Sequence, residues 1–269
     1  MKNNLKLLPL FAATLLLLSC GSRELLRSQS SNTLTVMSYN IHHANPPSIN
    51  GKIDLDAIAK VIKDQNPDLV ALQEVDVNTI RSGKINQASL LAERLGMNFF
   101  FAKAIDHEGG DYGVAILSKH PLTETKIHRL SSDPATKGEP RVLATALIKL
   151  PGNRHIRFGS THLDAQKNDN NRLLQVVEIN SIAKAEGLPF IIAGDLNATP
   201  ESATIHLLDQ QFIRTCEQCE FTIPVIEPKK TIDFIAFGKS SPFEVVSNRV
   251  IPEHYASDHL PVVSVLKFK

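Results

Sequence analysis

The stretch YASDHLPVVS, residues 255–264, places an acid and an imidazole side by side at the start of an apolar run. Val262, Val263 and Val265 follow Pro261, and this run predicts a buried strand near the end of the chain. Asp258 and His259 would then lie at the mouth of that strand. Ser-Asp-His alone is ordinary turn composition, so a function for the pair needs support elsewhere in the chain.

That support comes from other strand-like runs that end in polar residues. PDLVALQEV (67–75) is apolar until Gln73 and Glu74, and PFIIAGDLN (189–197) is apolar until Asp195. Polar side chains are costly inside a sheet, whereas at strand ends they can converge on one rim. The residues predicted at this rim are Asn40, Glu74, His162, Asp195, Asn197, Asp233, Asp258 and His259.

Amphipathic segments alternate with these runs and predict helices. Residues 54–66, 85–96, 171–187 and 201–211 have helical patterns, and Pro67 and Gly96 stop the first two. Strands covered by helices indicate the α/β class. Residues 33–269 contain no long low-complexity break and fit one large domain.

The first 32 residues differ from the rest. Lys2 and Lys6 precede the apolar run LLPLFAATLLLLSC, which is short for a membrane span and typical of a secretory signal in residues 1–19. Leu17-Leu18-Ser19-Cys20 resembles the end of a bacterial lipoprotein signal, in which the Cys becomes the lipidated N-terminus. We therefore expect lipidation at Cys20, a flexible tether in 20–32, and a lipid-anchored protein in the bacterial cell envelope. The alternative is a plain secreted protein with an incidental Cys.

Charge and composition argue against strong nucleic-acid binding. Removal of residues 1–19 takes away Lys2 and Lys6 and changes the formal net charge from +1 to −1. The chain has no Trp, so aromatic platforms for base stacking are scarce.

Other metal and nucleophile motifs are incomplete. Cys216 and Cys219 form a single CxxC without a second ligand pair, and they could equally be a local disulfide or two loop thiols. His42 and His43 suggest Zn²⁺, but no third ligand has convincing spacing. HExxH, GxSxG and GxxxxGK[ST] are absent from the sequence.

The motifs SYNIHH, LQEVD, GVAILSK, STHLD, GDLNATP, TIDFI and ASDHLPV, in this order, resemble those of the endonuclease/exonuclease/phosphatase superfamily. The resemblance spans residues 33–269. It implies a four-layer α/β sandwich in which two packed mixed β-sheets are flanked by helices. It also implies hydrolysis of phosphoester bonds.

Phosphoester hydrolysis needs a cation, a base for water, and donors to the phosphate oxygens. Glu74 and Asp258 are hard carboxylates that suit Mg²⁺ or Mn²⁺. By resemblance, Asn40 orders the metal-side ligands. The resemblance further implies that Asp195 orients or deprotonates water, that Asn197 donates to the phosphate, that His162 and His259 donate to it when protonated, and that Asp233 pairs with His259.

The sequence departs from several subfamilies of this superfamily. Val75 and Asp76 follow Gln73-Glu74 where the apurinic/apyrimidinic endonucleases usually have a Lys. QEVD and GDLNATP favour the deadenylase, sphingomyelinase and bacterial hydrolase branches. Arg81 and Tyr112, in polar loops near the motifs, are candidate substrate contacts.

We therefore expect a monomeric Mg²⁺-dependent phosphodiesterase that acts on a lipid, sugar or nucleotide phosphodiester outside the cytoplasm. The alternatives are an extracytoplasmic nuclease and a non-catalytic binding module on the same fold.

Overall fold

The strands pair into two six-stranded sheets in the computed structural model, which describes residues 32–269. The first sheet has the order β11-β12-β1-β2-β4-β3 and the second has the order β5-β6-β7-β8-β10-β9. The strands of the first sheet are β11 (Phe243–Val250), β12 (Val262–Phe268), β1 (Thr33–Asn40), β2 (Leu69–Val77), β4 (Gly110–Ser118) and β3 (Asn98–His107). Those of the second are β5 (Leu122–Leu130), β6 (Arg141–Leu150), β7 (Arg154–His162), β8 (Phe190–Asp195), β10 (Asp233–Gly238) and β9 (Phe212–Arg214).

Each sheet contains one parallel pair, and these pairs carry the polar strand ends. β1 runs parallel to β2 with Asn40 opposite Gln73, and β7 runs parallel to β8 with His162 opposite Asp195. The other pairings in both sheets are antiparallel, so both sheets are mixed. Because parallel strands end at the same edge, each pair brings its two C-terminal residues to one edge of its sheet, and the Asn40–Asp195 hydrogen bond joins the two edges.

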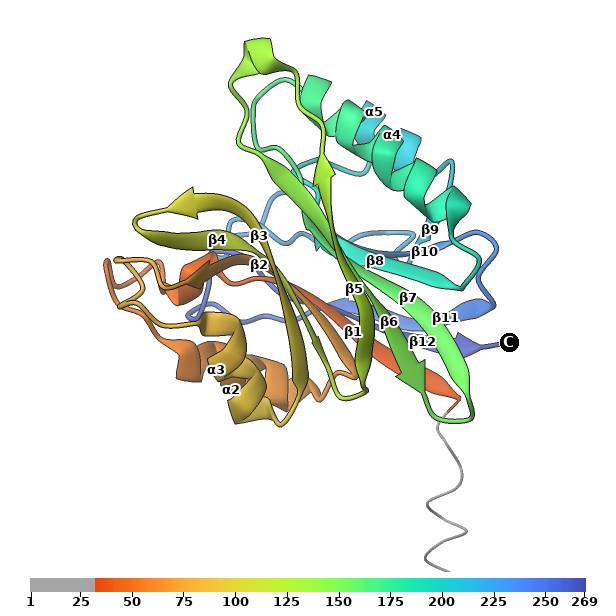
Figure 1. Cartoon of the computed structure of the whole chain (residues 1–269), viewed down its shortest axis with the longest axis horizontal. Helices are drawn as coiled ribbons and strands as arrows, with labels where there is room; N and C mark the ends of the chain where they lie inside the picture. Colours follow the sequence, from red (N-terminus) through yellow and green to blue (C-terminus); the bar gives the residue numbers. More distant parts are fainter. Residues whose placement is uncertain (1–31) are drawn as a thin grey trace, which may run out of the picture. The chain divides into compact units, whose positions relative to one another are not determined.

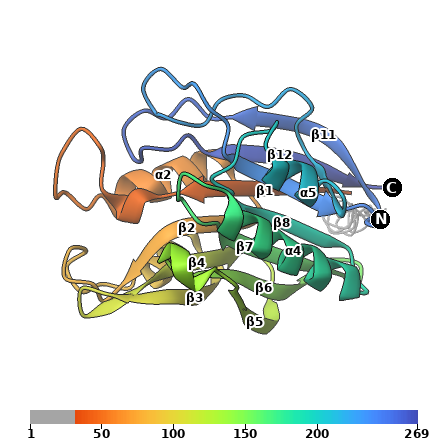
Figure 2. The same ribbon diagram turned by 90° about the horizontal axis from the view of Figure 1, so that it is seen from above.

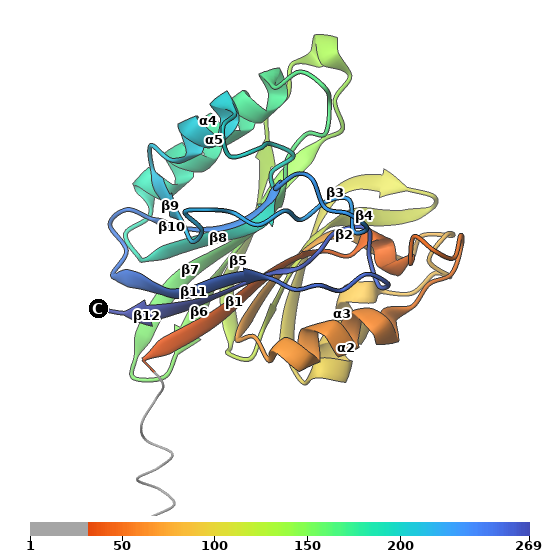
Figure 3. The same ribbon diagram turned by 180° about the vertical axis from the view of Figure 1, so that it is seen from behind.

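Helices cover the outer faces of the sheets (Figure 1). Figure 3 shows α2 (Leu55–Gln65) and α3 (Gln87–Leu95) on one side, with α4 (Asn170–Ala185) and α5 (Ala203–Leu208) on the other. Seen from above, α4 and α5 lie in front of the sheet that contains β7 and β8 (Figure 2). Local sequence sets the helix ends: the Asp54 carboxylate accepts from Ala57 N at 3.0 Å, and Asn66 ends α2 in the left-handed conformation.

The inward faces of the two sheets pack against each other through alternating apolar residues. Val36, Ala71, Ile116, Phe158 and Ile191 belong to this central core. A second core lies between the first sheet and α2 and α3, and a third lies between the second sheet and α4 and α5. The predicted four-layer sandwich of two mixed sheets flanked by helices is therefore confirmed.

The sequence patterns missed two strands. β5 is mostly exposed and polar, and β9 has only three residues, so neither has the apolar alternation that signals a strand.

Cys216 and Cys219 form a disulfide, so of the two alternatives for this pair, a local disulfide or two loop thiols, the structure has the disulfide. No helix in the described range is long and apolar enough to cross a membrane. The predicted signal segment and Cys20 lie outside the described residues.

Candidate active site

Asn40 joins the two sheets at the polar rim. Its side-chain nitrogen donates to Glu74 Oε1 and to Asp195 Oδ2, both at 3.1 Å. Its Oδ1 accepts from the backbone N–H of His42 at 3.1 Å, and its backbone carbonyl accepts from the Ser257 hydroxyl at 2.7 Å. Asn40 is fully buried, and these hydrogen bonds hold it in place. It therefore fixes the relative positions of Glu74 and Asp195, which come from different sheets.

A β-bulge orients Glu74. The pairing of β2 with β4 shifts register between Leu72 and Val75, and Glu74 adopts a φ of 57° there. In a regular strand, successive side chains point to opposite faces of the sheet, and both faces of β2 are covered. The bulge instead turns the Glu74 carboxylate toward Asn40. Burial raises the pKa of Glu74, the Asn40 hydrogen bond lowers it, and the charge of Asp258 raises it further.

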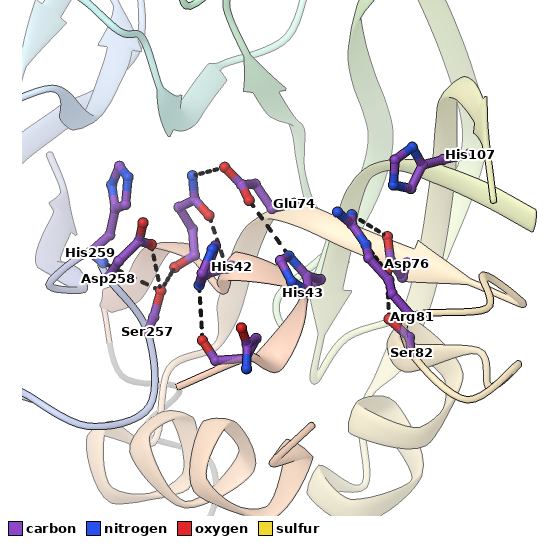
Figure 4. A network of polar contacts seen from close by, with 12 residues as sticks. His42, His43, Glu74, Asp76, Arg81, Ser82, His107, Ser257, Asp258 and His259 are labelled. Carbon is purple, nitrogen blue, oxygen red and sulfur yellow. Dashed lines mark hydrogen bonds and ion pairs between the residues drawn. The ribbon is translucent and has the colours of Figure 1, made fainter. Parts of the chain in front are cut away.

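Glu74 and Asp258 provide the oxygen ligands that suit a hard divalent cation. Among residues 32–269, neither carboxylate has a Lys or Arg nitrogen within 4 Å. The Ser257 hydroxyl lies 3.5 Å from Asp258 Oδ1. Figure 4 shows Asp258 and Glu74 in the same part of the polar network. Two carboxylates near each other without a cationic partner fit the donor set for Mg²⁺ or Mn²⁺, with Asn40 beside them.

Asp195 lies between the two histidines. His162 Nε2 is 3.4 Å from Asp195 Oδ2, and His259 Nε2 is 3.8 Å from the same oxygen. Burial and the charge of Asp233 raise the pKa of Asp195 to about 7, while His259, Asn197 and Asn40 act in the opposite direction. A carboxylate with this pKa is suited to accept a proton near neutral pH.

The surroundings of the two histidines shift their pKa values in opposite directions. Burial lowers the pKa of His259, but the charges of Asp233 and Asp195 outweigh it and raise that pKa to about 10. Burial, Arg141 and His259 hold the pKa of His162 well below its usual value. These opposite shifts favour a charged His259 and a neutral His162, and the donor role of each ring stays a prediction.

Hydrogen bonds explain how the neutral His162 acts as a donor. Arg141 Nη1 lies 3.4 Å from His162 Nδ1, so Nδ1 accepts and Nε2 carries the hydrogen. On His259, Nδ1 lies 2.9 Å from Asp233 Oδ2, and the Thr222 hydroxyl donates to the same oxygen at 2.6 Å. Both rings therefore present an Nε2–H to the space around Asp195 Oδ2.

Asn197 shapes the loop after β8. Its backbone N–H donates to Asp195 Oδ1 at 2.9 Å, and its side-chain amide donates to the Leu163 carbonyl at 3.0 Å. Its φ of 47° is one that Asn tolerates well. This is an Asx-type turn, and it leaves one amide hydrogen of Asn197 for a ligand.

Arg81 and Tyr112 lie together beside this rim. Arg81 donates to both carboxylate oxygens of Asp76, at 2.8 and 2.9 Å, and its guanidinium stands 5.4 Å from the Tyr112 ring centroid. Burial and the charge of Glu74 raise the pKa of Tyr112. Arg81 is thus held by a protein carboxylate, and Tyr112 is 9% exposed.

Arg141 is a site residue that sequence reasoning missed. It lines a narrow pocket with Tyr112 and His162, pairs with Glu139 at 2.8 Å, and has a buried Nε without a hydrogen-bond partner in the described range. The available signal was a charged residue at the start of the otherwise apolar run RVLATALI (141–148). Ser257 and Thr222 were missed as well, since their roles depend on contacts with Asn40 and Asp233 that no local pattern reveals.

Comparisons with known proteins agree with this architecture. The uncharacterized protein YbhP of Escherichia coli K12 is 24% identical over 241 residues, which cover 84% of this chain and 93% of that protein. A family protein from Beutenbergia cavernae has a TM-score of 0.72 and 24% identity, covering 88% of this chain and 72% of its own. The mannosyl-6-phosphatase of Bacteroides thetaiotaomicron has a TM-score of 0.71 and 20% identity, covering 87% of this chain and 100% of its own.

The family model named Endonuclease/Exonuclease/phosphatase family matches residues 37–259, a range that runs from β1 to His259. Its members hydrolyse phosphoester bonds and generally depend on a divalent metal. With two mixed six-stranded sheets and the polar rim between them, this chain belongs to the endonuclease/exonuclease/phosphatase family.

Proposed function

We propose that the chain is a Mg²⁺-dependent phosphodiesterase that acts on a lipid, sugar or nucleotide phosphodiester outside the cytoplasm. The observation that carries this proposal is the position of Asn40, whose amide nitrogen lies 3.1 Å from both Glu74 Oε1 and Asp195 Oδ2. This contact supports the proposal, because it holds Glu74, a proposed cation ligand, near Asp195, the proposed proton acceptor for water.

Glu74 and Asp258, with Asn40, would hold Mg²⁺, which supplies charge neutralisation at the phosphate when it is bound. Asp195 accepts the proton of the attacking water, since its pKa of about 7 lets it gain a proton near neutral pH. The Nε2–H groups of His162 and His259 donate to phosphate oxygens, where negative charge develops. Asp233 acts on His259, holding its ring and its positive charge.

The net charge favours a lipid, sugar or nucleotide phosphodiester over a long nucleic acid. The formal charge of residues 20–269 is −1, and a neutral surface gives little counterion-release affinity for DNA or RNA. A lipid anchor at Cys20 would place the site at an envelope surface, where lipid phosphodiesters are concentrated. We propose this anchor from the N-terminal sequence alone.

The test is a substrate panel on EDTA-treated protein with and without added Mg²⁺. The panel contains bis-p-nitrophenyl phosphate, p-nitrophenyl phosphate, a lipid phosphodiester, duplex DNA and RNA. We expect Mg²⁺-dependent hydrolysis of the diesters by the wild type and its loss in Asp195→Asn, which controls for contaminating hydrolases. Equal activity in EDTA, or in Asp195→Asn, contradicts the proposed chemistry. Preferred cleavage of duplex DNA with steeply salt-dependent binding favours a nuclease instead.

A further inference from the structure

The two residues that follow β1 and Ile41 project adjacent imidazole rings. His42, His43 and Ala44 have φ values of 45°, 43° and 59°, three successive residues in the left-handed region. Such a run is unfavourable for residues with a Cβ and needs support from its surroundings. Gln87, fully buried, gives that support by donating to the His43 carbonyl at 2.7 Å. The result is that the ring centroids of His42 and His43 lie 4.5 Å apart.

Glu74 completes a set of three donors with these rings. Its Oε1 accepts from Asn40, whereas its Oε2 lies 4.0 Å from His43 Nδ1. One donor atom from each of His42, His43 and Glu74 can be chosen so that all lie within 4.8 Å of one another. Figure 4 shows both rings beside the Glu74 carboxylate, with the contact from Glu74 to His43 drawn.

Each of the two imidazoles has a ring nitrogen that is free to bind a metal ion. His43 Nδ1 is buried and has no hydrogen-bond partner among the described residues. His42 Nδ1 lies 2.8 Å from the Asn45 carbonyl, so Nδ1 carries the hydrogen and the Nε2 lone pair is left available. A histidine that donates one ring nitrogen to a backbone carbonyl is oriented as metal-binding histidines commonly are.

We propose that His42, His43 and Glu74 form a second cation site, which takes a transition metal such as Zn²⁺. Two imidazoles and one carboxylate suit Zn²⁺, whereas Mg²⁺ prefers oxygen ligands only. Tetrahedral Zn²⁺ ligands lie about 3.4 Å apart, given bonds of about 2.1 Å, so side-chain rotations that draw the donors in by at most about 1.4 Å complete the site. Glu74 then belongs to both sites, with Oε1 on the Asn40 side and Oε2 on the histidine side.

The test measures Zn²⁺ binding by calorimetry in millimolar Mg²⁺, without substrate. All proteins are the full chain with Cys20→Ala, which removes that thiol as a competing ligand. The variants are His42→Asn and His43→Asn, because Asn tolerates the left-handed backbone of these positions. His206→Asn, at an exposed position in α5, is the matched control.

We expect one Zn²⁺ per wild-type chain, with the Kd raised at least about tenfold in each of the two variants and unchanged in the control. Thermal unfolding without Zn²⁺ checks that all variants are folded, and the wild type and control should gain stability with Zn²⁺. Equal Zn²⁺ affinity in wild type and both folded variants overturns the proposal, as does a wild type that binds no Zn²⁺ in Mg²⁺. Because no substrate is used, the result is separate from whether the chain hydrolyses phosphoesters.

Discussion

His259 Nδ1 lies 2.9 Å from Asp233 Oδ2, and both side chains are buried, with Asp233 at the start of β10 in the second sheet and His259 just before β12 of the first. The two residues are 26 positions apart in the chain. The pair sets both the orientation and the charge of the imidazole that faces Asp195.

Loss of the dyad should be non-additive. His259→Ala removes a donor to the phosphate, and loss of one such donor costs roughly 3–4 kcal/mol, or about a hundred- to a thousand-fold in kcat. Asp233→Asn should cost less, since the ring stays but loses its charged partner. The double variant should be little slower than His259→Ala alone, because the residues act as a unit. Steady-state kinetics of the three variants check this, and fully additive losses contradict the dyad.

The two neighbours Asp258 and His259 should differ in how metal affects their loss. Asp258→Asn weakens a cation ligand, so higher Mg²⁺ or Mn²⁺ should restore part of the activity. Glu74→Ala should lose most activity and its Mg²⁺ dependence should weaken, while His259→Ala should gain nothing from added metal. Activity measured across a Mg²⁺ and Mn²⁺ titration gives the answer, with exposed Glu201→Ala as the control. Restoration of His259→Ala by Mn²⁺ is the outcome that contradicts this division.

The pH profile of kcat/KM should be bell-shaped. Asp195 must be ionised to accept a proton, so activity should fall about tenfold per pH unit below its pKa of about 7. His259 must be protonated to donate strongly, so activity should fall again above about 10. A cation bound beside Asn40 stabilises ionised Asp195, so the acidic limb should move to lower pH as Mg²⁺ increases. An acidic limb near pH 4 at limiting Mg²⁺ is incompatible with this assignment.

The Asp76–Arg81 pair should contribute to stability in a pH-dependent way. Burial raises the pKa of Asp76, but hydrogen bonds from Arg81, Ser82 and Thr79 outweigh it and the net pKa is lowered. Asp76→Asn leaves a half-buried guanidinium without its partner and should cost about 3 kcal/mol at pH 7. Since the folded-state pKa lies below the unfolded one of about 3.9, this stabilisation is present above that pH and lost as pH falls through the folded value.

Urea midpoints of wild type and Asp76→Asn from pH 7 downward measure this effect. The exposed pair Lys60–Asp64 provides the control, and Asp64→Asn should change stability by less than about 0.5 kcal/mol. A difference between wild type and Asp76→Asn that grows below pH 4 would show that the sign is wrong.

The proposed anchor makes a separate prediction. If Cys20 is lipidated, the wild type should partition with membranes and carry a lipid label, whereas Cys20→Ala should appear in the soluble fraction. Fractionation with metabolic lipid labelling checks both points. A wild type without label and a Cys20→Ala protein that partitions identically contradict the anchor.

The order of secondary structure follows from sequence because its causes are local. Apolar alternation, helix caps and breakers act over a few residues, so the apolar runs before Glu74, before Asp195 and after Pro261 were predicted as strands. The motifs at their ends, taken in order, resemble those of the endonuclease/exonuclease/phosphatase superfamily, and that resemblance implied phosphoester chemistry. β5 was missed because its polar face is stabilised by pairing with β6, a contact that leaves no periodic signal.

Only the tertiary structure decided which residues far apart in the chain come into contact. Asn40 and Asp195 are 155 positions apart, and their contact depends on how the two sheets pack. The bulge that turns Glu74 toward Asn40 arises from pairing with β4, and the same carboxylate supplies the third donor that His42 and His43 lacked in the sequence. Side-chain identity therefore fixed which chemistry was available. The packing of the two sheets fixed which side chains meet, because burial and register depend on partners that no local segment contains.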